Sequence, residues 1–159
     1  MVGLRQVASG PTMSEGSLEV VRRSFEAFVS GDFDAAFASF DPRAEWMTAE
    51  DEPDSRTYRG LEEVRRFVSS LPEPWADRFE RTVVPEQYID LGDWVVVPTS
   101  GVVHGRGSGI EVEIRETYAV RVRGGAIVRV EEYRTREQAL EAVRVNSEAE
   151  PGRPPRPAS

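Results

Sequence analysis

The chain lacks cysteine and lysine, and His104 is its only histidine among 159 residues. Without cysteine there is no disulfide, no thiolate nucleophile and no cysteine-based metal site. Without lysine there is no Schiff-base chemistry and no lysine-anchored pyridoxal phosphate. A single histidine also excludes a histidine-rich zinc site. We therefore expect no metal and no cofactor, and any activity should be acid–base chemistry by the side chains alone.

Several classes of partner and location are also disfavoured. A membrane span needs roughly 18 or more consecutive apolar residues, and the chain has no such run. The first residues lack the basic-then-apolar pattern of a signal peptide, so we expect a cytoplasmic protein. The net charge is −8, with acidic residues and arginines interspersed, which argues against nucleic acid as a partner. We expect a flexible arm at 1–16, one domain at 17–147 and a disordered, proline-rich tail at 148–159.

Apolar periodicity divides the chain into a helical first half and a sheet-forming second half. The predicted elements are helices at 17–30 and 32–40, a strand at 44–48, a helix at 61–71, strands at 78–90 and three times within 94–133, and a helix at 136–143. Asp32 should cap the second helix, and Thr135 with Gln138 should form a capping box for the last. Sequential antiparallel strands whose one face is covered by helices make an α+β fold with a cup-like shape.

Three segments carry a family resemblance: SGDFDAAFASFDPRAEW at 30–46, YRGLEEVRRFV at 58–68 and SGIEVEIRETYAVRVRGGAIVRVEEYRTREQALEA at 108–142. Their order and spacing resemble the SnoaL-like family of the nuclear transport factor 2-like superfamily, over residues 17–145. The resemblance implies a curved antiparallel sheet wrapped around the N-terminal helices to form a cone-shaped pocket. The family includes polyketide cyclases, ketosteroid isomerases, epoxide hydrolases, dehydratases and proteins without a known reaction, so the residues of the site must decide the function.

The resemblance allows three activities to be tested by position. The positions of the isomerase's tyrosine, aspartate base and second acid hold Ser24, Thr48 and Tyr118. The positions of the epoxide hydrolase's arginine and two aspartates hold Thr99, Gly101 and Glu132. Neither set is complete, and we expect ketosteroid isomerase activity to be absent or very weak. A cyclase of this family needs one well-placed acid and an apolar pocket, which the sequence is compatible with.

Strand alternation places a pair of carboxylates on the apolar face. A three-residue loop at 123–125 would pair Tyr118 with Val130 and Glu116 with Glu132. Two adjacent carboxylates on such a face would share a proton, and Tyr118 would donate to them, an arrangement suited to general acid–base chemistry. Two other arrangements stay open. In the first, one of the carboxylates pairs with an arginine of the third helix, such as Arg65 or Arg66. In the second, the pair lies at the solvent-exposed opening of the cone.

The remaining predictions concern the pocket and the outer face. His104 faces inward if the loop that follows it has three residues and outward if it has four; a surface position is favoured, although a pocket histidine would be the obvious base. The predicted catalytic residues are Glu132, Glu116, Tyr118 and His104. The predicted ligand-binding residues are Trp46, Thr48, Tyr58, Thr99, Val112, Ile114 and Val130.

We expect these residues to bind a small, largely apolar organic molecule, and any reaction to be an isomerisation, cyclisation, dehydration or hydrolysis. The alternative is a non-catalytic ligand-binding or dimeric interaction module of the same fold. The charged outer face of the sheet is expected to be either solvated or the interface of a homodimer.

Overall fold

A computed structural model of the chain describes residues 13–49, 55–70, 79–105, 107 and 109–149, and the predicted arm and tail fall largely outside them. The helices are α2 (Met13–Ser30), α3 (Phe33–Phe37), α4 (Leu61–Ser70) and α5 (Arg136–Ala149). The strands are β1 (Phe40–Met47), β2 (Thr57–Arg59), β3 (Phe79–Pro85), β4 (Ile89–Asp90), β5 (Trp94–Gly105), β6 (Glu111–Arg123) and β7 (Ala126–Tyr133). None of the described helices is long and apolar enough to cross a membrane.

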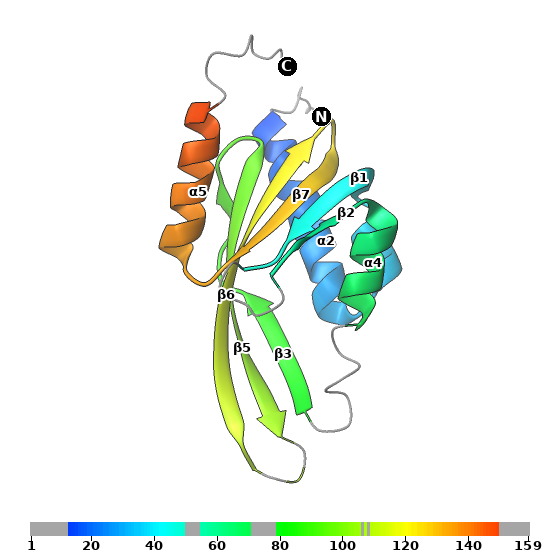
Figure 1. Cartoon of the computed structure of the whole chain (residues 1–159), viewed down its shortest axis with the longest axis vertical. Helices are drawn as coiled ribbons and strands as arrows, with labels where there is room; N and C mark the ends of the chain where they lie inside the picture. Colours follow the sequence, from blue (N-terminus) through cyan, green and yellow to red (C-terminus); the bar gives the residue numbers. More distant parts are fainter. Residues whose placement is uncertain (1–12, 50–54, 71–78, 106, 108, 150–159) are drawn as a thin grey trace, which may run out of the picture.

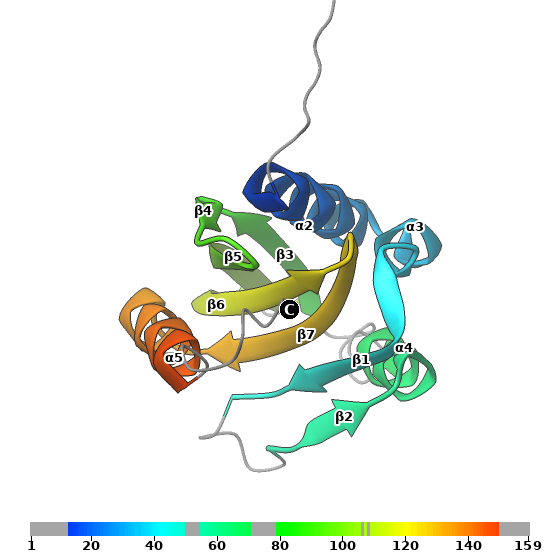
Figure 2. The same cartoon turned by 90° about the horizontal axis from the view of Figure 1, so that it is seen from above.

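All the described strands belong to one seven-stranded sheet in the order β2-β1-β7-β6-β5-β3, with β4 paired to β5. Every pairing is antiparallel except that of β1 with β7, which is parallel. The sheet bends around α2, and α5 lies against its other face (Figure 2). The long β5–β6 hairpin and β3 extend beyond the helices as an arm (Figure 1). The predicted α+β fold with a curved sheet is confirmed.

The two faces of the sheet have separate apolar clusters. On the concave face, Val21 of α2, Phe37 of α3 and Val64 of α4 are buried with residues of β1, β5, β6 and β7. On the convex face, α5 buries Ala139 and Val143 against β5 and β6. Each buried valine or phenylalanine side chain contributes about 1.5–3 kcal/mol by leaving water. The convex face is thus partly covered by a helix of the same chain, which the sequence analysis did not anticipate.

The caps at Asp32 and Thr135 were predicted correctly, but the start of the first helix and the end of the second were not, since α2 begins at Met13 rather than at residue 17. The backbone N–H of Ala35 donates to Asp32 Oδ1 at 3.1 Å, and that of Gln138 donates to Thr135 Oγ1 at 3.1 Å. The helix predicted to run to residue 40 ends at Phe37, and β1 begins at Phe40. The reason is tertiary, because Phe40 pairs with Ile127 of β7, which sequence alone does not show. Pro42, which lacks an N–H, lies where this pairing is interrupted.

The predicted register of β6 against β7 is wrong. Gly124 and Gly125 have φ values of 58° and 79° and form a two-residue turn, so Arg123 pairs with Ala126. Val128 is an extra residue that forms a bulge, since Val122 pairs with Ile127 but Arg121 pairs with Arg129. The bulge places apolar residues of β7 on the concave face. The sequence had suggested the same face for this strand, but through a three-residue loop in place of the bulge.

In the observed register Glu132 pairs with Tyr118, and Glu116 pairs with Thr99 of β5. Glu116 and Glu132 are therefore not cross-strand neighbours. The predicted carboxylate pair is wrong, and with it the argument for a shared proton.

Candidate active site

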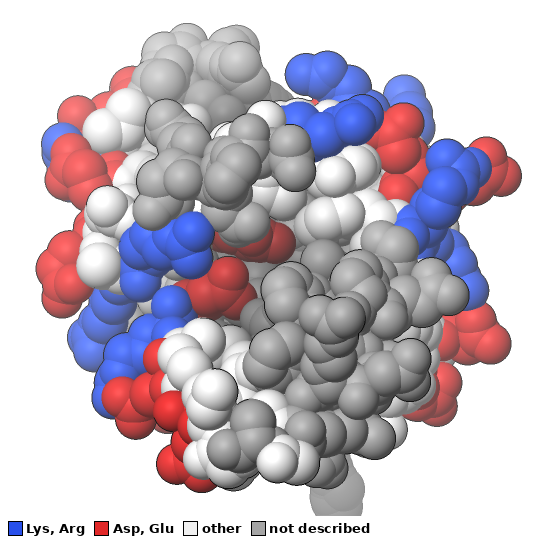
Figure 3. Space-filling model, turned by 60° about the horizontal axis from the view of Figure 1, so that its bottom comes forward, with Lys and Arg blue, Asp and Glu red and all other residues white. Residues whose placement is uncertain are grey.

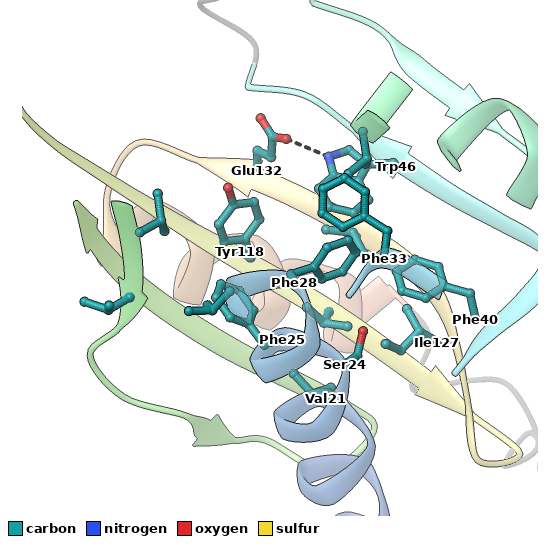
Figure 4. A pocket seen from close by; sticks show the side chains of 16 residues that line it. Val21, Ser24, Phe25, Phe28, Phe33, Phe40, Trp46, Tyr118, Ile127 and Glu132 are labelled. Carbon is teal, nitrogen blue, oxygen red and sulfur yellow. Dashed lines mark hydrogen bonds between the residues drawn. The ribbon is translucent and has the colours of Figure 1, made fainter. Parts of the chain in front are cut away.

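A cavity of about 380 Å³ lies between the concave face of the sheet and helices α2, α3 and α4. Its wall is mostly apolar. The aromatic lining residues are Phe25, Phe28, Phe33, Phe40, Trp46 and Tyr118, the aliphatic ones are Val21, Val29, Val68, Val83, Val84, Val120, Ile127 and Val130, and the polar ones are Ser24 and Glu132. Glu132 and Tyr118 lie at one end of this group and Val21 and Ser24 at the other (Figure 4).

Glu132 is the only carboxylate among the described residues of the pocket wall, and Trp46 holds it. Trp46 Nε1 donates to Glu132 Oε2 at 2.6 Å, and each residue is only 7% exposed. The parallel pairing of β1 with β7 makes this contact possible, because it places Trp46 beside Val130, two residues before Glu132. A buried carboxylate needs hydrogen-bond donors, and the indole N–H supplies one without adding charge.

The indole ring of Trp46 is itself fixed by other aromatic rings. Its centroid lies 6.2 Å from those of Phe28, Phe67 and Tyr118 and 6.5 Å from that of Phe40. Aromatic pairs at these separations add specific geometry to area burial. The donor that orients Glu132 is therefore held by packing from α2, α4, β1 and β6.

Tyr118 connects Glu132 with the second predicted acid. It stands opposite Glu132 on β6, and its hydroxyl donates to Glu116 Oε1 at 3.1 Å. Glu116 is half-buried and is not part of the pocket wall. The three side chains thus follow one another along the concave face, and only the first two line the cavity.

Of the predicted site residues, Glu132, Tyr118, Trp46 and Val130 line one cavity. Their roles in catalysis and binding stay predictions. The other residues predicted to contact the ligand, Thr48, Tyr58, Thr99, Val112 and Ile114, are not part of its wall.

The partners of these residues show why they lie elsewhere. The hydroxyl of Thr48 donates to the Arg56 carbonyl and accepts from the Arg56 N–H. The hydroxyl of Thr99 donates to the Glu116 carbonyl at 2.8 Å. Tyr58 stacks on Phe67 with ring centroids 4.1 Å apart. Strand alternation had placed Val112 and Ile114 on the correct face of the sheet but not at the correct position along the strand. Both lie on the part of β6 that extends beyond its pairing with β7.

His104 lies on the surface of the arm, away from the pocket. It pairs with Glu111, so the loop between Gly105 and Ile110 has four residues, and the side chain is 47% exposed. Its Nδ1 is 3.2 Å from Glu111 Oε2. The outward alternative for this histidine is therefore the one observed.

The arginines of α4 do not form the ion pairs considered from the sequence. Arg65 pairs with Asp34 at 2.7 Å and Arg66 with Glu62 at 3.6 Å. Within the described parts of the chain, no group of histidine and carboxylate side chains is arranged to hold a metal ion. On the face drawn in Figure 3, the described acidic and arginine side chains are interspersed and do not form a large patch of one charge.

Sequence reasoning missed the contribution of the helices to the pocket wall. Val21, Phe25 and Phe28 form the apolar stripe of α2, and all three line the cavity. The stripe predicts which face of the helix is buried, but it does not distinguish core from pocket wall. Ile127 was missed because the bulge at Val128 reverses its predicted orientation.

Tyr88 lies behind the pocket wall, with its ring 6.4 Å from that of Phe25. Its hydroxyl is buried and has no hydrogen-bond partner among the described residues. Burial raises the pKa of Tyr88 above its ordinary value, Glu26 raises it further, and Arg22, whose guanidinium lies over the ring, lowers it. The hydroxyl is thus a destabilising buried polar group close to the site.

Residues 21–130 match the family model of the SnoaL-like domain, and the chain belongs to this family. Among solved structures it is similar to an NTF2-like protein of Burkholderia thailandensis E264, with 25% identity and a TM-score of 0.63 over 78% of this chain and 96% of that one. A second NTF2-like protein of unknown function, from Burkholderia pseudomallei K96243, is 23% identical, with a TM-score of 0.62 over 81% of this chain and 95% of the other.

A third similar structure is that of TerC co-crystallized with polyporic acid, which is 20% identical, with a TM-score of 0.63 over 79% of this chain and 96% of that one. No curated protein matches the chain significantly. Membership of the family is consistent with ligand binding or with an activity of the polyketide cyclase type.

Proposed function

We propose that the cavity binds a small, largely apolar organic molecule and that Glu132 acts on it as an acid–base group. The observation that carries the proposal is that Glu132, oriented by Trp46, lies at one end of a pocket whose described lining is otherwise mostly apolar. Ligand sites are typically of this kind, with apolar walls and a few placed polar groups. The similar protein TerC has been co-crystallized with an organic acid, polyporic acid, which supports a ligand-binding role for this pocket.

The reaction that this arrangement supports is proton transfer without a cofactor. Glu132 accepts a proton from an acidic C–H bond of the ligand, and the electron pair moves onto a neighbouring carbonyl to form an enolate. The hydroxyl of Tyr118, on the adjacent strand, leaves its hydrogen bond to Glu116 Oε1 and donates to the developing oxyanion. Return of the proton to another carbon gives an isomer. Attack of the enolate carbon on a second carbonyl of the same molecule closes a ring, and Glu132 then returns its proton to the new alkoxide. General acid–base catalysis of this kind contributes about 100- to 10,000-fold in rate.

Solvent deuterium exchange tests this chemistry without knowledge of the natural substrate. The probe is 2-tetralone, an apolar bicyclic ketone with acidic C–H bonds, incubated in D2O with the protein and followed by NMR. We expect exchange faster than in buffer, and Glu132→Gln should return it to the buffer rate. Glu113→Gln, which removes a carboxylate on the outer side of β6, is the matched control. Equal exchange by wild type and Glu132→Gln would contradict the role of Glu132.

If 2-tetralone binds but exchanges no faster than in buffer, the non-catalytic alternative, a ligand-binding module, is favoured. The two functions are separated because binding is measured on a second sample in H2O, where the indole N–H keeps its proton. The indole N–H signal of Trp46, which lines the pocket, reports occupancy directly.

We also propose a homodimer through the outer face of β1 and β7. On this face Arg129 bonds Glu45 at 2.6 Å and Glu131 at 2.5 Å, and Tyr133 donates to Glu131 at 2.6 Å. Because these charges are already paired within the chain, covering them leaves none of them unpaired, which is the usual cost of burying charge. The outer face of β5 and β6 is instead covered by α5.

A further inference from the structure

Ser24 is a polar lining residue that has no part in the chemistry proposed for the other end of the cavity. It belongs to α2, is 3% exposed and lies at the end of the cavity where Val21 lies (Figure 4). The other polar side chains of the described wall, Trp46, Tyr118 and Glu132, are grouped at the opposite end. Ser24 is therefore placed to contact a different part of a bound ligand. In pockets of this kind, a few placed polar groups fix the orientation of the ligand.

The hydroxyl proton of Ser24 is already used in a hydrogen bond. The hydroxyl donates to the Ala36 carbonyl at 2.9 Å, in a contact that is buried from water. Ala36 lies in the short helix α3, near its C-terminal end, where backbone carbonyls have no partner within the helix. This bond holds the proton of the hydroxyl toward α3. A hydroxyl oxygen also has two acceptor lone pairs, so Ser24 can offer a ligand an acceptor but not a donor.

The burial of this end of the cavity makes the acceptor selective. Val21 and Ser24 are only 2% and 3% exposed, whereas two other lining residues, Val29 and Val84, are 46% and 50% exposed. A ligand group beside Ser24 is therefore removed from water. A hydroxyl group buried there keeps a hydrogen bond if it donates to Ser24, whereas a group that can only accept loses its hydrogen bonds to water without replacement.

We propose that Ser24 is a specificity-determining residue, which accepts a hydrogen bond from a hydroxyl group of the ligand. The ligand class is an apolar ketone that carries this hydroxyl at the end remote from its reacting carbonyl. The carbonyl end lies beside Glu132 and Tyr118, and the hydroxyl end lies beside Ser24. This inference rests on the proposed function, because it assigns the ligand class of the same pocket, and it goes beyond that proposal by naming a second polar group of the ligand.

The test compares 2-tetralone with 6-hydroxy-2-tetralone and 7-hydroxy-2-tetralone, whose hydroxyl groups are on the ring remote from the carbonyl. Dissociation constants are measured in H2O by NMR from the Trp46 indole signal, and the hydroxyl preference is the constant of 2-tetralone divided by that of the hydroxylated probe. We expect Ser24→Ala to lower this preference by about fivefold or more for at least one isomer. The loss of the hydrogen bond to Ala36 acts on all probes and cancels in the ratio. The matched control is Ser30→Ala, which removes an exposed hydroxyl of the same helix that donates to the Ala27 carbonyl at 3.0 Å, and it should leave the preference within about twofold of wild type.

The outcomes separate this inference from the proposed function. If 2-tetralone binds but neither hydroxylated probe does, or if Ser24→Ala leaves the preference unchanged for both isomers, the role of Ser24 is overturned and the apolar pocket stands. If none of the three probes binds the wild-type protein, both proposals fail. Should Ser24→Ala fold poorly, Ser24→Cys replaces it, because a thiol is of similar size but its sulfur is a weak acceptor. Loss of the preference in that variant supports the inference, and its retention contradicts it.

Discussion

The hydrogen bond between Trp46 and Glu132 is the contact on which the geometry of the candidate site depends. The two atoms are 2.6 Å apart and both residues are buried. Trp46→Phe removes the donor but leaves an aromatic ring among the four that surround it. Glu132→Met removes the acceptor and fills a similar volume with an apolar chain. Together with the double variant, these changes form a thermodynamic cycle.

The expected magnitudes follow from burial and charge. A hydrogen bond to a charged group contributes about 1.5–3 kcal/mol, and breaking one inside a protein leaves the partner desolvated. The smaller ring of phenylalanine adds a packing loss of about 1 kcal/mol. Trp46→Phe should therefore lower the free energy of unfolding by about 2.5–4 kcal/mol when Glu132 is present. In the Glu132→Met background the indole N–H has lost this acceptor, so its removal offsets part of the packing loss and Trp46→Phe should cost about 1 kcal/mol or less.

Urea unfolding of the four proteins, followed by circular dichroism, gives the coupling free energy directly. We expect a value of about 1.5–3 kcal/mol, because the packing loss cancels in the cycle. A coupling below about 0.5 kcal/mol would refute the reasoning, since it would mean that the indole N–H does not hold the carboxylate in solution.

Other parts of the structure lead to four further predictions. Tyr88→Phe should stabilise the protein by up to about 1 kcal/mol in urea unfolding, because it removes a buried hydroxyl that has no partner among the described residues. The pKa of Tyr88 is raised from 10.0 in the folded state, so the folded protein holds the phenol proton more tightly than the unfolded chain does. Above pH 10 the unfolded chain loses this proton first, which lowers the free energy of unfolding, so the wild type should lose more stability than Tyr88→Phe in alkaline buffers. The protein should not isomerise a 3-oxo-Δ5 steroid, because Thr48 and Ser24 lack a carboxylate and a phenol and their hydroxyls bond the backbone; turnover that disappears in Glu132→Gln would show that this exclusion is wrong. Sedimentation velocity at micromolar concentration should give a dimer, and a monomer would count against the proposed interface on β1 and β7.

The fold was largely predictable because its signals are local. Apolar periodicity identified α2, α4 and the long strands, and side-chain chemistry identified the caps at Asp32 and Thr135. The parallel pairing of β1 with β7 and the bulge at Val128 were not predictable, because both depend on which strands meet in space. The bulge matters most, since together with the shorter turn it changed the cross-strand partner of Glu132 from Glu116 to Tyr118.

The site was predictable only in part, for a related reason. Strand alternation gives the face on which a side chain lies, which was sufficient for Glu132, Tyr118 and Val130. It does not give the depth along the strand, and so Val112 was expected in the pocket although it is 51% exposed on the arm. The Trp46–Glu132 contact joins residues 86 positions apart and has no signal in the local sequence.

The central claim, that this cavity is the ligand site, is tested most directly by filling it. Val130→Phe places a larger side chain in the pocket wall, whereas Val112→Phe makes the same substitution on the exposed arm, outside that wall. Binding of 2-tetralone is measured by NMR for the wild type and both variants, after unfolding curves confirm that each is folded. We expect Val130→Phe to weaken binding by at least about tenfold and Val112→Phe to leave it within about twofold of wild type. Equal binding by all three proteins, or a loss confined to Val112→Phe, would contradict the account.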